Sequence, residues 1–506
     1  MLVKITSAAL HGIDAYPVEV EVDIAAGFPT FVTVGLPDAA VRESKERVRA
    51  ALKNCGYDLE SKRITINLAP ADRKKEGSAF DLPIALGFLA FLGVVAAERL
   101  RDRLFVGELA LDGRLKPVRG VLPVALMARR AGFRGVVVPA ANAREAALVR
   151  GLEVFALEDL VRVVRLLRDP EAVPPCRFDE RDLVEAPAYA VDFEDVKGQL
   201  HAKRALEVAA AGAHNVLMVG PPGAGKTMLA RRLPTILPDL GYEEMLEVTR
   251  VYSAAGLLAG AGTVSARPFR APHHTVSDAG LVGGGLVPKP GEVSLAHHGL
   301  LFLDELPEFR RKVLEDLRQP VEDGRVTVVR SGYAVTFPAS FMLVAAMNPC
   351  ADVRRGLLGK AADCTDGEKA RYYSKISGPL LDRIDIQLDV PEVKFGDIVS
   401  RASGESSAAI RARVVRARER QTARFAGRGV HANARMGPRE VKEFCRLPAE
   451  AEKLLETAVV RLGFSARAYD RVLKVARTIA DLEGSGDITA PHVSEAVQYR
   501  MMDRLR

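Results

Sequence analysis

The chain has 506 residues, of which 48% are hydrophobic and 27% are charged. This composition excludes an intrinsically disordered protein, and the length predicts about three domains. The net charge of +7 is compatible with a polyanionic partner but is also ordinary for a well-solvated surface.

No stretch of the sequence predicts a secretory signal or a membrane span. The longest apolar run, residues 82–97, is interrupted by Pro83, Gly87 and Gly93 and is shorter than the ~20 residues that cross a bilayer. We therefore predict a buried core helix there. The five cysteines are an odd number without the spacing of a disulfide framework, which indicates a reducing, cytoplasmic environment.

Residues 1–165 predict an α+β domain, because short strands alternate with helical patterns. Apolar and polar residues alternate over 18–24 as in a half-buried strand, and residues 39–55 have helical spacing. Further strands are predicted at 31–34, 63–68, 103–106 and 135–139.

This region resembles a Lon-type protease domain, of the ribosomal S5 domain 2-like fold, in residues 107–118 and in the strand 136–139. The resemblance implies a Ser-Lys dyad. With Gly77 aligned on the glycine of the protease motif, the nucleophile position falls on Ala79 and the lysine position on Leu122. Neither side chain can carry out acyl transfer.

Ser78 lies one position from the expected nucleophile, and Lys75 and Lys116 are the lysines that can be offered as its partner. A dyad depends on a hydrogen bond that a shifted register disrupts. We therefore expect a non-proteolytic scaffold that mediates assembly or contact with a partner protein. Residues 166–189, rich in charge and proline, are predicted to be a linker.

A phosphate-binding loop is predicted between a short buried strand at 215–219 and a helix that starts near 228. Its glycines let backbone N–H groups turn inward, and the helix N-terminus faces a polyphosphate. Lys226 would reach the β- and γ-phosphates of ATP, and the Thr227 hydroxyl would ligate Mg²⁺. A glycine-rich turn with a purely structural role is the alternative. The complete loop is Gly220, Pro221, Pro222, Gly223, Ala224, Gly225, Lys226 and Thr227.

Two further strands end in polar residues suited to the same site. The apolar run 300–303 is followed by Asp304 and Glu305, and the run 341–347 is followed by Asn348. At the carboxyl edge of a parallel sheet, Asp304 would hold Mg²⁺ through its water shell, and Glu305 would polarise the attacking water. Asn348 would orient the same water as a sensor. For the paired carboxylates, a solvated turn is the alternative.

The segment between these phosphate motifs is too long and too rich in turns for a simple P-loop connection. Turns are predicted within 267–275, 280–285 and 289–292, and residues 324–330 and 333–337 predict a hairpin joined at residues 331 and 332. Two pairs of adjacent histidines invite a metal hypothesis, but their spacing repeats no known ligand set. They are His273 with His274 and His297 with His298.

These two insertions resemble the helix-2 insert and the pre-sensor hairpin of the AAA+ clade that contains magnesium chelatase I subunits and MCM helicases. Over nearly the whole chain, the sequence is similar to the bacterial ComM/YifB family of magnesium chelatase-like ATPases. The resemblance implies an α/β fold, with a P-loop AAA+ core over residues 190–400 and a C-terminal helical lid over 401–506. It also implies a homo-oligomeric ring, as a hexamer, that uses ATP and Mg²⁺.

The resemblance assigns roles to four residues outside the phosphate motifs. Val196 and Gln199 would contact the adenine, with an N-terminal helix cap as the alternative. Arg383 would be an arginine finger that acts on the neighbouring subunit. Arg467, just before the lid helix at 469–482, would be the second sensor. Cationic side chains stabilise the charge that develops on the γ-phosphate, although arginines at such places are often simple surface charge.

The family often carries four cysteines after the sensor asparagine, a set that suits zinc. Here only Cys350 and Cys364 remain, with Asp352 and Ala362 aligned at the other two positions. Two thiolates cannot close a tetrahedral site, so the sequence contains no complete zinc site.

The first functional hypothesis is a DNA motor, since the family includes ComM, which is associated with DNA branch migration during natural transformation. Lys289, Arg325 and Arg330 would grip the phosphates of single-stranded or branched DNA. The arginine-rich helix at 410–420 is an ordinary solvated face or, less simply, a second nucleic-acid contact.

The competing hypothesis is a remodelling ATPase that acts on a polypeptide, with Tyr333 or Phe337 as its aromatic pore residue. A third hypothesis is a scaffold that binds ATP but hardly turns it over. The intact set of Lys226, Asp304, Glu305 and Asn348 argues against that scaffold.

Overall fold

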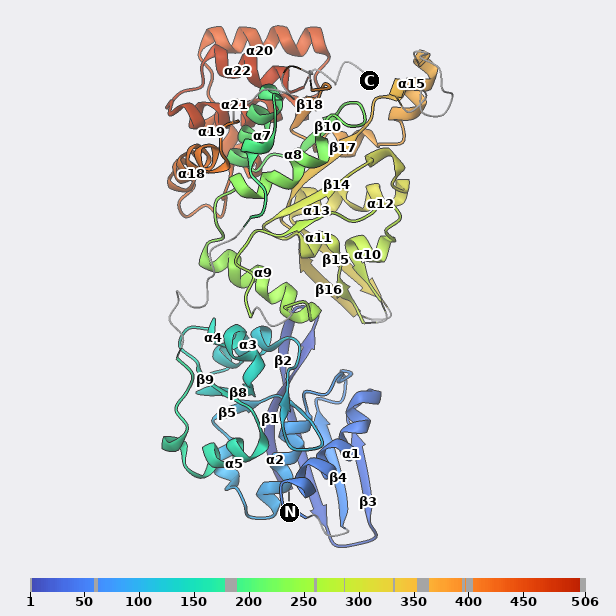
Figure 1. Cartoon of the computed structure of the whole chain (residues 1–506), viewed down its shortest axis with the longest axis vertical. Coiled ribbons are helices and arrows are strands. Elements are labelled where there is room, and N and C mark those ends of the chain that lie inside the picture. The colour runs from blue at the N-terminus through green and yellow to red at the C-terminus, as the bar shows by residue number, and fades with distance from the viewer. Residues whose placement is uncertain are drawn as a thin grey trace. The chain divides into compact units, whose positions relative to one another are not determined.

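The computed structural model describes residues 2–58, 62–177, 189–258, 262–285, 287–330, 333–352, 364–393, 396 and 404–500. They form two compact units, Met1–Ala186 with Gly241–Ser265, and Pro187–Leu240 with Ala266–Arg506 (Figure 1). Each unit has a hydrophobic core of its own. The predicted division into four segments remains a prediction.

The first unit contains a four-stranded sheet in the order β1-β2-β4-β3. Its strands are β1 (Leu2–His11), β2 (Asp14–Ala25), β3 (Thr30–Val34) and β4 (Arg63–Ala69). The alternation predicted over 18–24 is confirmed in β2, where Val18, Val20 and Val22 are completely buried. Such alternation gives the sheet one apolar face.

Helix α2 (Asp81–Phe91) packs on β1 and β2, and α1 (Ala39–Asn54) packs on α2. A Cβ on Gly87 would lie 2.5 Å from Val22 Cγ2, so this glycine lets α2 approach the sheet closely. The buried helix predicted in the apolar run is thereby confirmed. Among the described residues, no helix has the length and apolar character of a membrane span.

The remainder of the first unit is built on a parallel sheet in the order β5-β8-β9. Its strands are β5 (Arg103–Phe105), β8 (Gly135–Pro139) and β9 (Glu153–Leu157), and the small antiparallel pair beside it is β6 (Glu108–Leu109) with β7 (Leu115–Lys116). The helices are α3 (Val121–Arg130), α4 (Ala143–Ala147) and α5 (Leu160–Arg168). The mixture of helices and strands is the α+β pattern that the sequence predicts.

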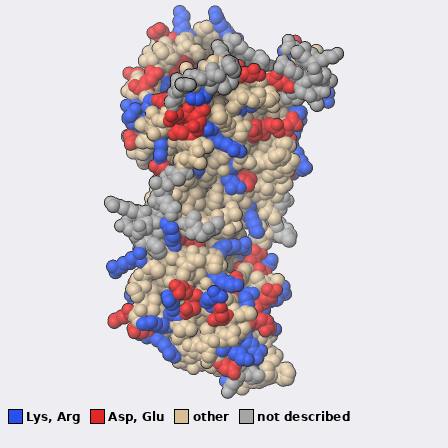
Figure 2. All heavy atoms as spheres, viewed as in Figure 1, with Lys and Arg blue, Asp and Glu red and all other residues tan. Residues whose placement is uncertain are grey.

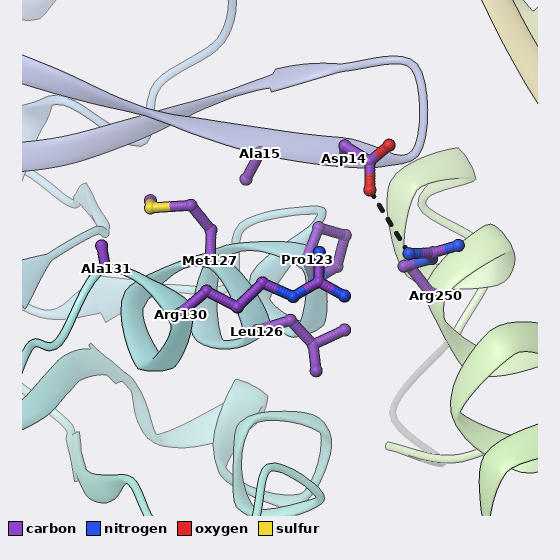
Figure 3. Close-up of a pocket in the computed structure, with 8 residues that line it drawn as sticks. All are labelled: Asp14, Ala15, Pro123, Leu126, Met127, Arg130, Ala131 and Arg250. Atoms are coloured by element: carbon purple, nitrogen blue, oxygen red, sulfur yellow. Dashed lines mark hydrogen bonds and ion pairs between the residues drawn. The ribbon is translucent and has the colours of Figure 1, made fainter.

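Helix α9 (Tyr242–Ala255) belongs to the first unit, although its sequence lies within the range predicted for the ATPase core. It packs against α3, and Ser253 Oγ donates to the buried Glu145 Oε2 at 2.7 Å. Arg250 forms an ion pair of 3.3 Å with Asp14 beside a pocket over α3 (Figure 3). The chain therefore leaves the second unit after its phosphate-binding loop and returns at Ala266.

The second unit is organised around a five-stranded sheet in the order β11-β14-β17-β10-β18. Its strands are β10 (Val216–Val219), β11 (Phe269–Arg270), β14 (Leu300–Leu303), β17 (Met342–Met347) and β18 (Ile386–Asp389), and all their pairings are parallel. Every residue of β10, β14 and β17 is buried. Since the strands are parallel, the loops after β10, β14 and β17 meet at one edge of the sheet.

Short elements separate and follow these strands. They are α7 (Leu200–Gly212), α8 (Lys226–Arg232), α10 (Asp278–Val282), β12 (Gly283–Gly284), β13 (Lys289–Pro290), α11 (Glu292–Leu295), α12 (Arg311–Asp316), α13 (Arg318–Asp323), β15 (Arg325–Arg330) and β16 (Tyr333–Pro338). The predicted hairpin is confirmed as β15 paired with β16, whereas its turn at 331–332 lies outside the described residues. Val326, Val328 and Phe337 form its buried face.

Helices dominate the end of the chain, as the sequence predicts. They are α15 (Asp366–Tyr373), α16 (Gly378–Leu381), α18 (Ser407–Arg424), α19 (Pro438–Phe444), α20 (Ala449–Leu462), α21 (Ala466–Glu483) and α22 (Ala490–Gln498). In α18 the apolar seam of Ile410, Val414 and Ala417 is buried. Its arginines form ion pairs within the unit, for example Arg413 with Glu207 and Glu405. These pairs do not favour nucleic-acid contact at this helix.

Candidate nucleotide-binding site

The loop 220–227 joins β10 to α8, as a phosphate-binding loop requires. Gly223 and Gly225 have φ of +82° and +90°, a region that side chains with a Cβ rarely adopt. Gly220 is needed for a different reason, because a Cβ there would lie 2.1 Å from the carbonyl oxygen of Val390, just after β18. The loop therefore depends on its glycines for both conformation and packing.

Replacing Gly220 with alanine should destabilise the second unit by roughly 1–3 kcal/mol, because the added methyl group forces the loop away from β18. The difference in unfolding free energy can be measured by chemical denaturation. Gly367→Ala is the matched control, since a Cβ on Gly367 in α15 meets no atom within 4 Å. Equal stability of the two variants would refute the close packing at Gly220.

Lys226 is held at this loop by three oxygen acceptors. Its ammonium donates to the carbonyls of Gly220 at 2.6 Å and Pro221 at 2.8 Å, and to Asn348 Oδ1 at 3.0 Å. Burial lowers the pKa of Lys226, and the negative charge of Asp304 opposes that shift. The P-loop lysine and the predicted sensor asparagine therefore meet at one point, although 122 positions separate them.

Thr227 and Asp304 are also in direct contact. The Thr227 hydroxyl donates to Asp304 Oδ2 at 2.7 Å, and the other carboxylate oxygen accepts from the Glu305 N–H at 3.0 Å. Mg²⁺ prefers oxygen ligands such as hydroxyl and carboxylate oxygens, so Thr227 and Asp304 would hold the ion. This donor set fits the Mg²⁺ site predicted from the sequence.

Glu305 has a left-handed backbone, with φ of +53°. A non-glycine residue in this conformation is strained, and such residues concentrate at functional sites. Its side chain is 55% exposed, and Oε2 lies 3.5 Å from His274 Nδ1. The carboxylate of Glu305, the residue after Asp304, is thus in contact with His274 and accessible to water.

His274 also belongs to this site, through its contact with Glu305, and the sequence did not indicate this role. The adjacency of His273 and His274 suggested only a metal, whereas His273 Nδ1 bonds Thr275 Oγ1 at 2.9 Å. In the second pair, His297 Nδ1 accepts from the Ser340 N–H at 3.0 Å. No sequence spacing could have signalled the contact between His274 and Glu305, because the two lie on separate segments.

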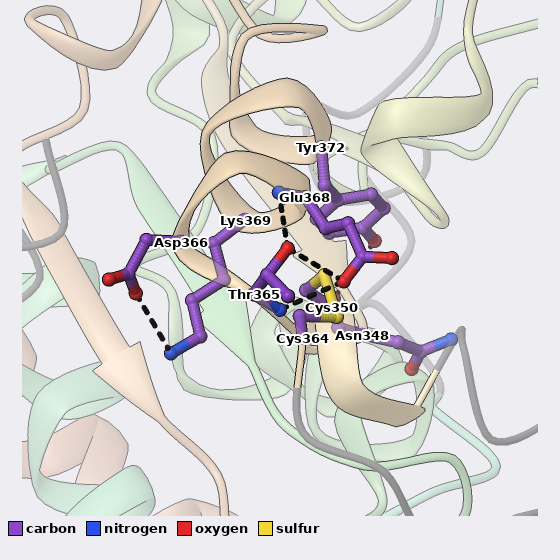
Figure 4. Close-up of a disulfide and its surroundings, with 8 residues drawn as sticks. All are labelled: Asn348, Cys350, Cys364, Thr365, Asp366, Glu368, Lys369 and Tyr372. Atoms are coloured by element: carbon purple, nitrogen blue, oxygen red, sulfur yellow. Dashed lines mark hydrogen bonds and ion pairs between the residues drawn. A yellow bond between two sulfur atoms is a disulfide. The ribbon is translucent and has the colours of Figure 1, made fainter.

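The segment after Asn348 is fixed by contacts to α15 (Figure 4). The Tyr372 hydroxyl donates to the Asn348 carbonyl at 2.9 Å, and Cys350 is joined to Cys364 by a disulfide. This bond corrects the expectation that the cysteines are reduced, and it leaves no thiolate of this pair for zinc. The aligned position Ala362 lies outside the described residues.

The two predicted adenine contacts differ in their surroundings. Val196 is completely buried in the hydrophobic core, and its carbonyl accepts from Lys203 at 2.7 Å. Gln199 has φ of +53°, and its amide donates to the carbonyls of Ala224 at 3.3 Å and Pro391 at 2.6 Å. Gln199 therefore touches the P-loop, whereas Val196 packs beneath it in the core.

Arg383 lies near the edge of the sheet opposite the P-loop. Its carbonyl accepts from Asn215 Nδ2 at 3.0 Å, and Asn215 directly precedes β10, whose four residues span ~13 Å. Its guanidinium pairs with Glu322 and donates to the Pro379 carbonyl at 2.8 Å. The backbone of Arg383 is therefore at the end of the sheet away from the P-loop.

Arg467 lies in the first turn of α21 and is exposed. Burial lowers the pKa of Arg383, and the positive charges of Arg318, Arg467 and Arg471 lower it further. The two arginines predicted from the family resemblance thus belong to one cationic group at the edge of the second unit.

Lys289 and Arg325, two of the predicted DNA contacts, are exposed. Lys289 lies on β13 in the short hairpin β12–β13, and β12 packs against β15 of the hairpin β15–β16. The backbone of Arg330 pairs with that of Tyr333, and the side chains of these two residues are not among those that the structure describes. Phe337, offered as a pore aromatic, is fully buried and therefore unavailable.

The displaced protease pair does not form in the first unit. The Ser78 hydroxyl donates to Glu108, and the buried Lys75 ammonium donates to the Pro70 carbonyl. Lys116 is exposed on β7, and Leu122 at the aligned lysine position is completely buried. Ser78 and Lys75 are thus each bonded to a different partner, and the loss of proteolytic chemistry stays a prediction.

Family models match three parts of the chain: magnesium chelatase subunit ChlI at residues 192–398, a further part of ChlI at 20–142 and the ChlI C-terminal region at 404–500. The chain is 45% identical to YifB of Salmonella typhimurium, over 99% of this chain and 97% of that protein. It is 44% identical to the competence protein ComM of Haemophilus influenzae, over 100% and 98%. The magnesium-chelatase 67 kDa subunit of Chlorobaculum parvum is 29% identical over 34% of this chain and 25% of that protein.

Proposed function

The chain belongs to the ComM/YifB family of magnesium chelatase-like proteins, and on this premise we propose that it is a Mg²⁺-dependent ATPase, assembled as a hexameric ring, that moves along DNA. The observation that carries the ATPase is the contact of Thr227 with Asp304, beside Lys226 and Asn348. These four side chains come from three separate strand ends, and P-loop ATPases use such donors for Mg²⁺ and phosphates.

In the proposed reaction, Lys226 binds the β- and γ-phosphates, and Thr227 and Asp304 hold Mg²⁺, which neutralises phosphate charge when bound. The Glu305 carboxylate takes a proton from the attacking water, and the Asn348 amide orients that water. Gln199 and the segment of Val196 border the nucleotide base. His274 keeps the Glu305 side chain in place through the 3.5 Å contact.

We propose that Arg383 and Arg467 act on the ATP of the neighbouring subunit. Two features support this: the Arg383 backbone is at the sheet edge opposite the P-loop, and the Arg467 guanidinium is close enough to lower the pKa of Arg383. A heterologous contact between identical subunits, repeated around an axis, closes a ring. Each ATP would then be split where two subunits meet.

We propose DNA as the polymer because one full-length relative is a competence protein and because Lys289 and Arg325 are exposed on adjoining hairpins. Basic and acidic side chains are interspersed on the face seen in Figure 2, so binding would depend on these local contacts. Such contacts are made to phosphates and carry no base sequence information. DNA as the polymer implies a cytoplasmic site of action, and the first unit would serve assembly or recruit a protein partner.

DNA should stimulate the ATPase several-fold at low salt, and the stimulation should fade as salt rises, because each neutralised phosphate releases a counterion. Single-stranded and branched DNA are the substrates to compare in a steady-state assay at several salt concentrations. Replacing Lys289, Arg325 and Arg330 together with alanine should remove the stimulation and leave basal turnover. Arg311→Ala is the control, since that arginine is exposed on α12.

Stimulation by an unfolded polypeptide, together with no response to any DNA, would instead support the remodelling ATPase. If DNA still stimulates the triple variant, the DNA contact is not made by the basic residues of these hairpins.

A further inference from the structure

We infer that Asp385 and Arg471 form a clamp whose role is to position Arg383 and Arg467 for the neighbouring subunit's ATP. This inference rests on the proposed function and adds two positioning residues to it. Neither residue touches the phosphate motifs of its own subunit in the described contacts; both lie beside the residues that would reach the next subunit.

Asp385 is the centre of the clamp. Its side chain is completely buried, Oδ2 accepts from the Asn215 N–H at 2.9 Å, and Oδ1 pairs with the Arg471 guanidinium. Burial alone would raise the pKa of Asp385, but the positive charge of Arg471 and the hydrogen bonds from His214 and Arg471 together outweigh burial and hold that pKa below its usual range. A buried, ionised carboxylate persists only with such partners, so the pair is fixed in place.

The clamp holds the turn that carries Arg383. Asp385 lies two residues after Arg383, whose carbonyl accepts from Asn215 Nδ2 at 3.0 Å. Between them, the Ile384 carbonyl accepts from Arg500 Nη1 at 2.7 Å. The carbonyls of Arg383 and Ile384 are thus both hydrogen-bonded, and these bonds hold the backbone that carries the Arg383 side chain.

The clamp also holds the helix that carries Arg467. Arg471 follows Arg467 by one turn of α21, so the two side chains lie on the same face of the helix. Two turns further on, Thr478 Oγ1 bonds His214 Nε2 at 2.8 Å, and His214 Nδ1 lies 3.5 Å from Asp385 Oδ2. Helix α21 is thus attached at two points, by Thr478 to His214 before β10 and by Arg471 to Asp385 before β18.

Charge explains why a carboxylate is needed. Arg383 lies near three other positive charges, since those of Arg318, Arg467 and Arg471 lower the pKa of Arg383. Asp385 is the fully buried acid paired within this group. Neutralising it as Asp385→Asn keeps the acceptor for Asn215 but removes the charge that draws Arg471 inward. The arginines should then separate.

As the sole subunit, Asp385→Asn should lose turnover by about 100-fold, the scale of a 1 Å misplacement of a reacting group, while ATP affinity changes little. A purely structural role of Asp385 would also lower turnover. Subunit mixing distinguishes that role from positioning of the arginines for the neighbouring subunit. Asp385→Asn subunits keep an intact P-loop, and Lys226→Ala subunits keep intact arginines. Each heterologous interface takes its P-loop from one subunit and its arginines from the next. In an equimolar mixture, about a quarter of the interfaces therefore pair the intact P-loop of an Asp385→Asn subunit with the intact arginines of a Lys226→Ala subunit.

We expect this mixture to recover turnover well above either variant alone. Lys226→Ala mixed with Glu305→Gln should show no recovery, because both changes lie in the same half of the site. Absence of recovery with Asp385→Asn, while Lys226→Ala mixed with Arg383→Ala recovers, would overturn the clamp and assign Asp385 to its own P-loop strand. If the Arg383→Ala mixture also fails to recover, the proposed shared site is wrong instead.

Arg471→Gln provides a second route, because its side chain is 21% exposed and glutamine retains an N–H donor toward Asp385. It should behave as Asp385→Asn does, with low turnover alone and recovery in the mixture with Lys226→Ala. Normal turnover of Arg471→Gln alone would overturn the clamp even if Asp385→Asn does not fold.

Discussion

The Glu305→Gln variant should bind ATP with nearly unchanged affinity and hydrolyse it at least about 100-fold more slowly. The amide is close in size to the carboxylate but cannot accept the proton of the attacking water, and general base catalysis contributes factors of 10²–10⁴. Thr227, Asp304 and Lys226 are untouched, so the phosphate and Mg²⁺ contacts remain. Steady-state turnover and titration with a fluorescent ATP analogue measure the two quantities separately.

Glu308→Gln is the matched control, three positions further along the chain. Glu308 is 47% exposed and pairs with Lys375 at 3.2 Å, so its change should leave turnover within about twofold. Equal losses in Glu305→Gln and Glu308→Gln would mean that general negative charge, and not one positioned base, supports hydrolysis. Unchanged turnover in Glu305→Gln would remove this residue from the reaction.

The Arg383→Ala variant should lose turnover by about 10³-fold with ATP affinity preserved, since an arginine finger contributes 10³–10⁵ to phosphoryl transfer. In the subunit itself, Arg383 pairs with Glu322, which lies on α13. This pair must open before the guanidinium can reach another subunit. Glu322→Gln should therefore leave turnover at or above the unmodified level, because it releases the arginine.

Turnover at several ATP concentrations distinguishes the possible roles of Arg383. A fall in kcat with little change in KM supports an arginine that acts in the transition state. A rise in KM alone would mean that Arg383 contributes only to binding. Arg311→Ala, which removes an exposed arginine from α12, should change neither quantity.

The phosphate site could be predicted because its signals are local. The loop 220–227 lies between a strand and a helix, and Asp304, Glu305 and Asn348 directly follow apolar strands. The rule that parallel strands share a carboxyl edge then brings these segments together without knowledge of the packing. The structure joins Lys226 to Asn348 and Thr227 to Asp304, in agreement with that expectation.

The contacts at the amino-terminal ends of β10 and β18, where Arg383 and Asp385 lie, could not be predicted in the same way. β18 contains Gln387 and ends in Asp389, so it lacks the continuous apolar run that marks β10 and β14 in the sequence. Asp385 is separated from Arg471 by 86 positions and from Asn215 by 170. Pairing of a single acid with a single arginine over such separations leaves no periodicity in the sequence.

Helix α9 and the disulfide were also inaccessible from the sequence. The pattern of α9 is that of an ordinary amphipathic helix, and its unit is decided by contacts such as Ser253 with Glu145, 108 positions away. Cys350 and Cys364 are 14 positions apart in the sequence, a spacing that is compatible with several kinds of loop. Their pairing follows from the position of α15 beside the end of β17, which the spacing of cysteines does not encode.

The central claim is that ATP is split only where two subunits meet, and the most direct measurement is turnover per subunit across a dilution series, with the oligomeric state followed by mass photometry. The account predicts that turnover per subunit rises with the fraction of assembled protein and is negligible for the monomer. A monomer that hydrolyses ATP at the same rate as the assembled protein would contradict it.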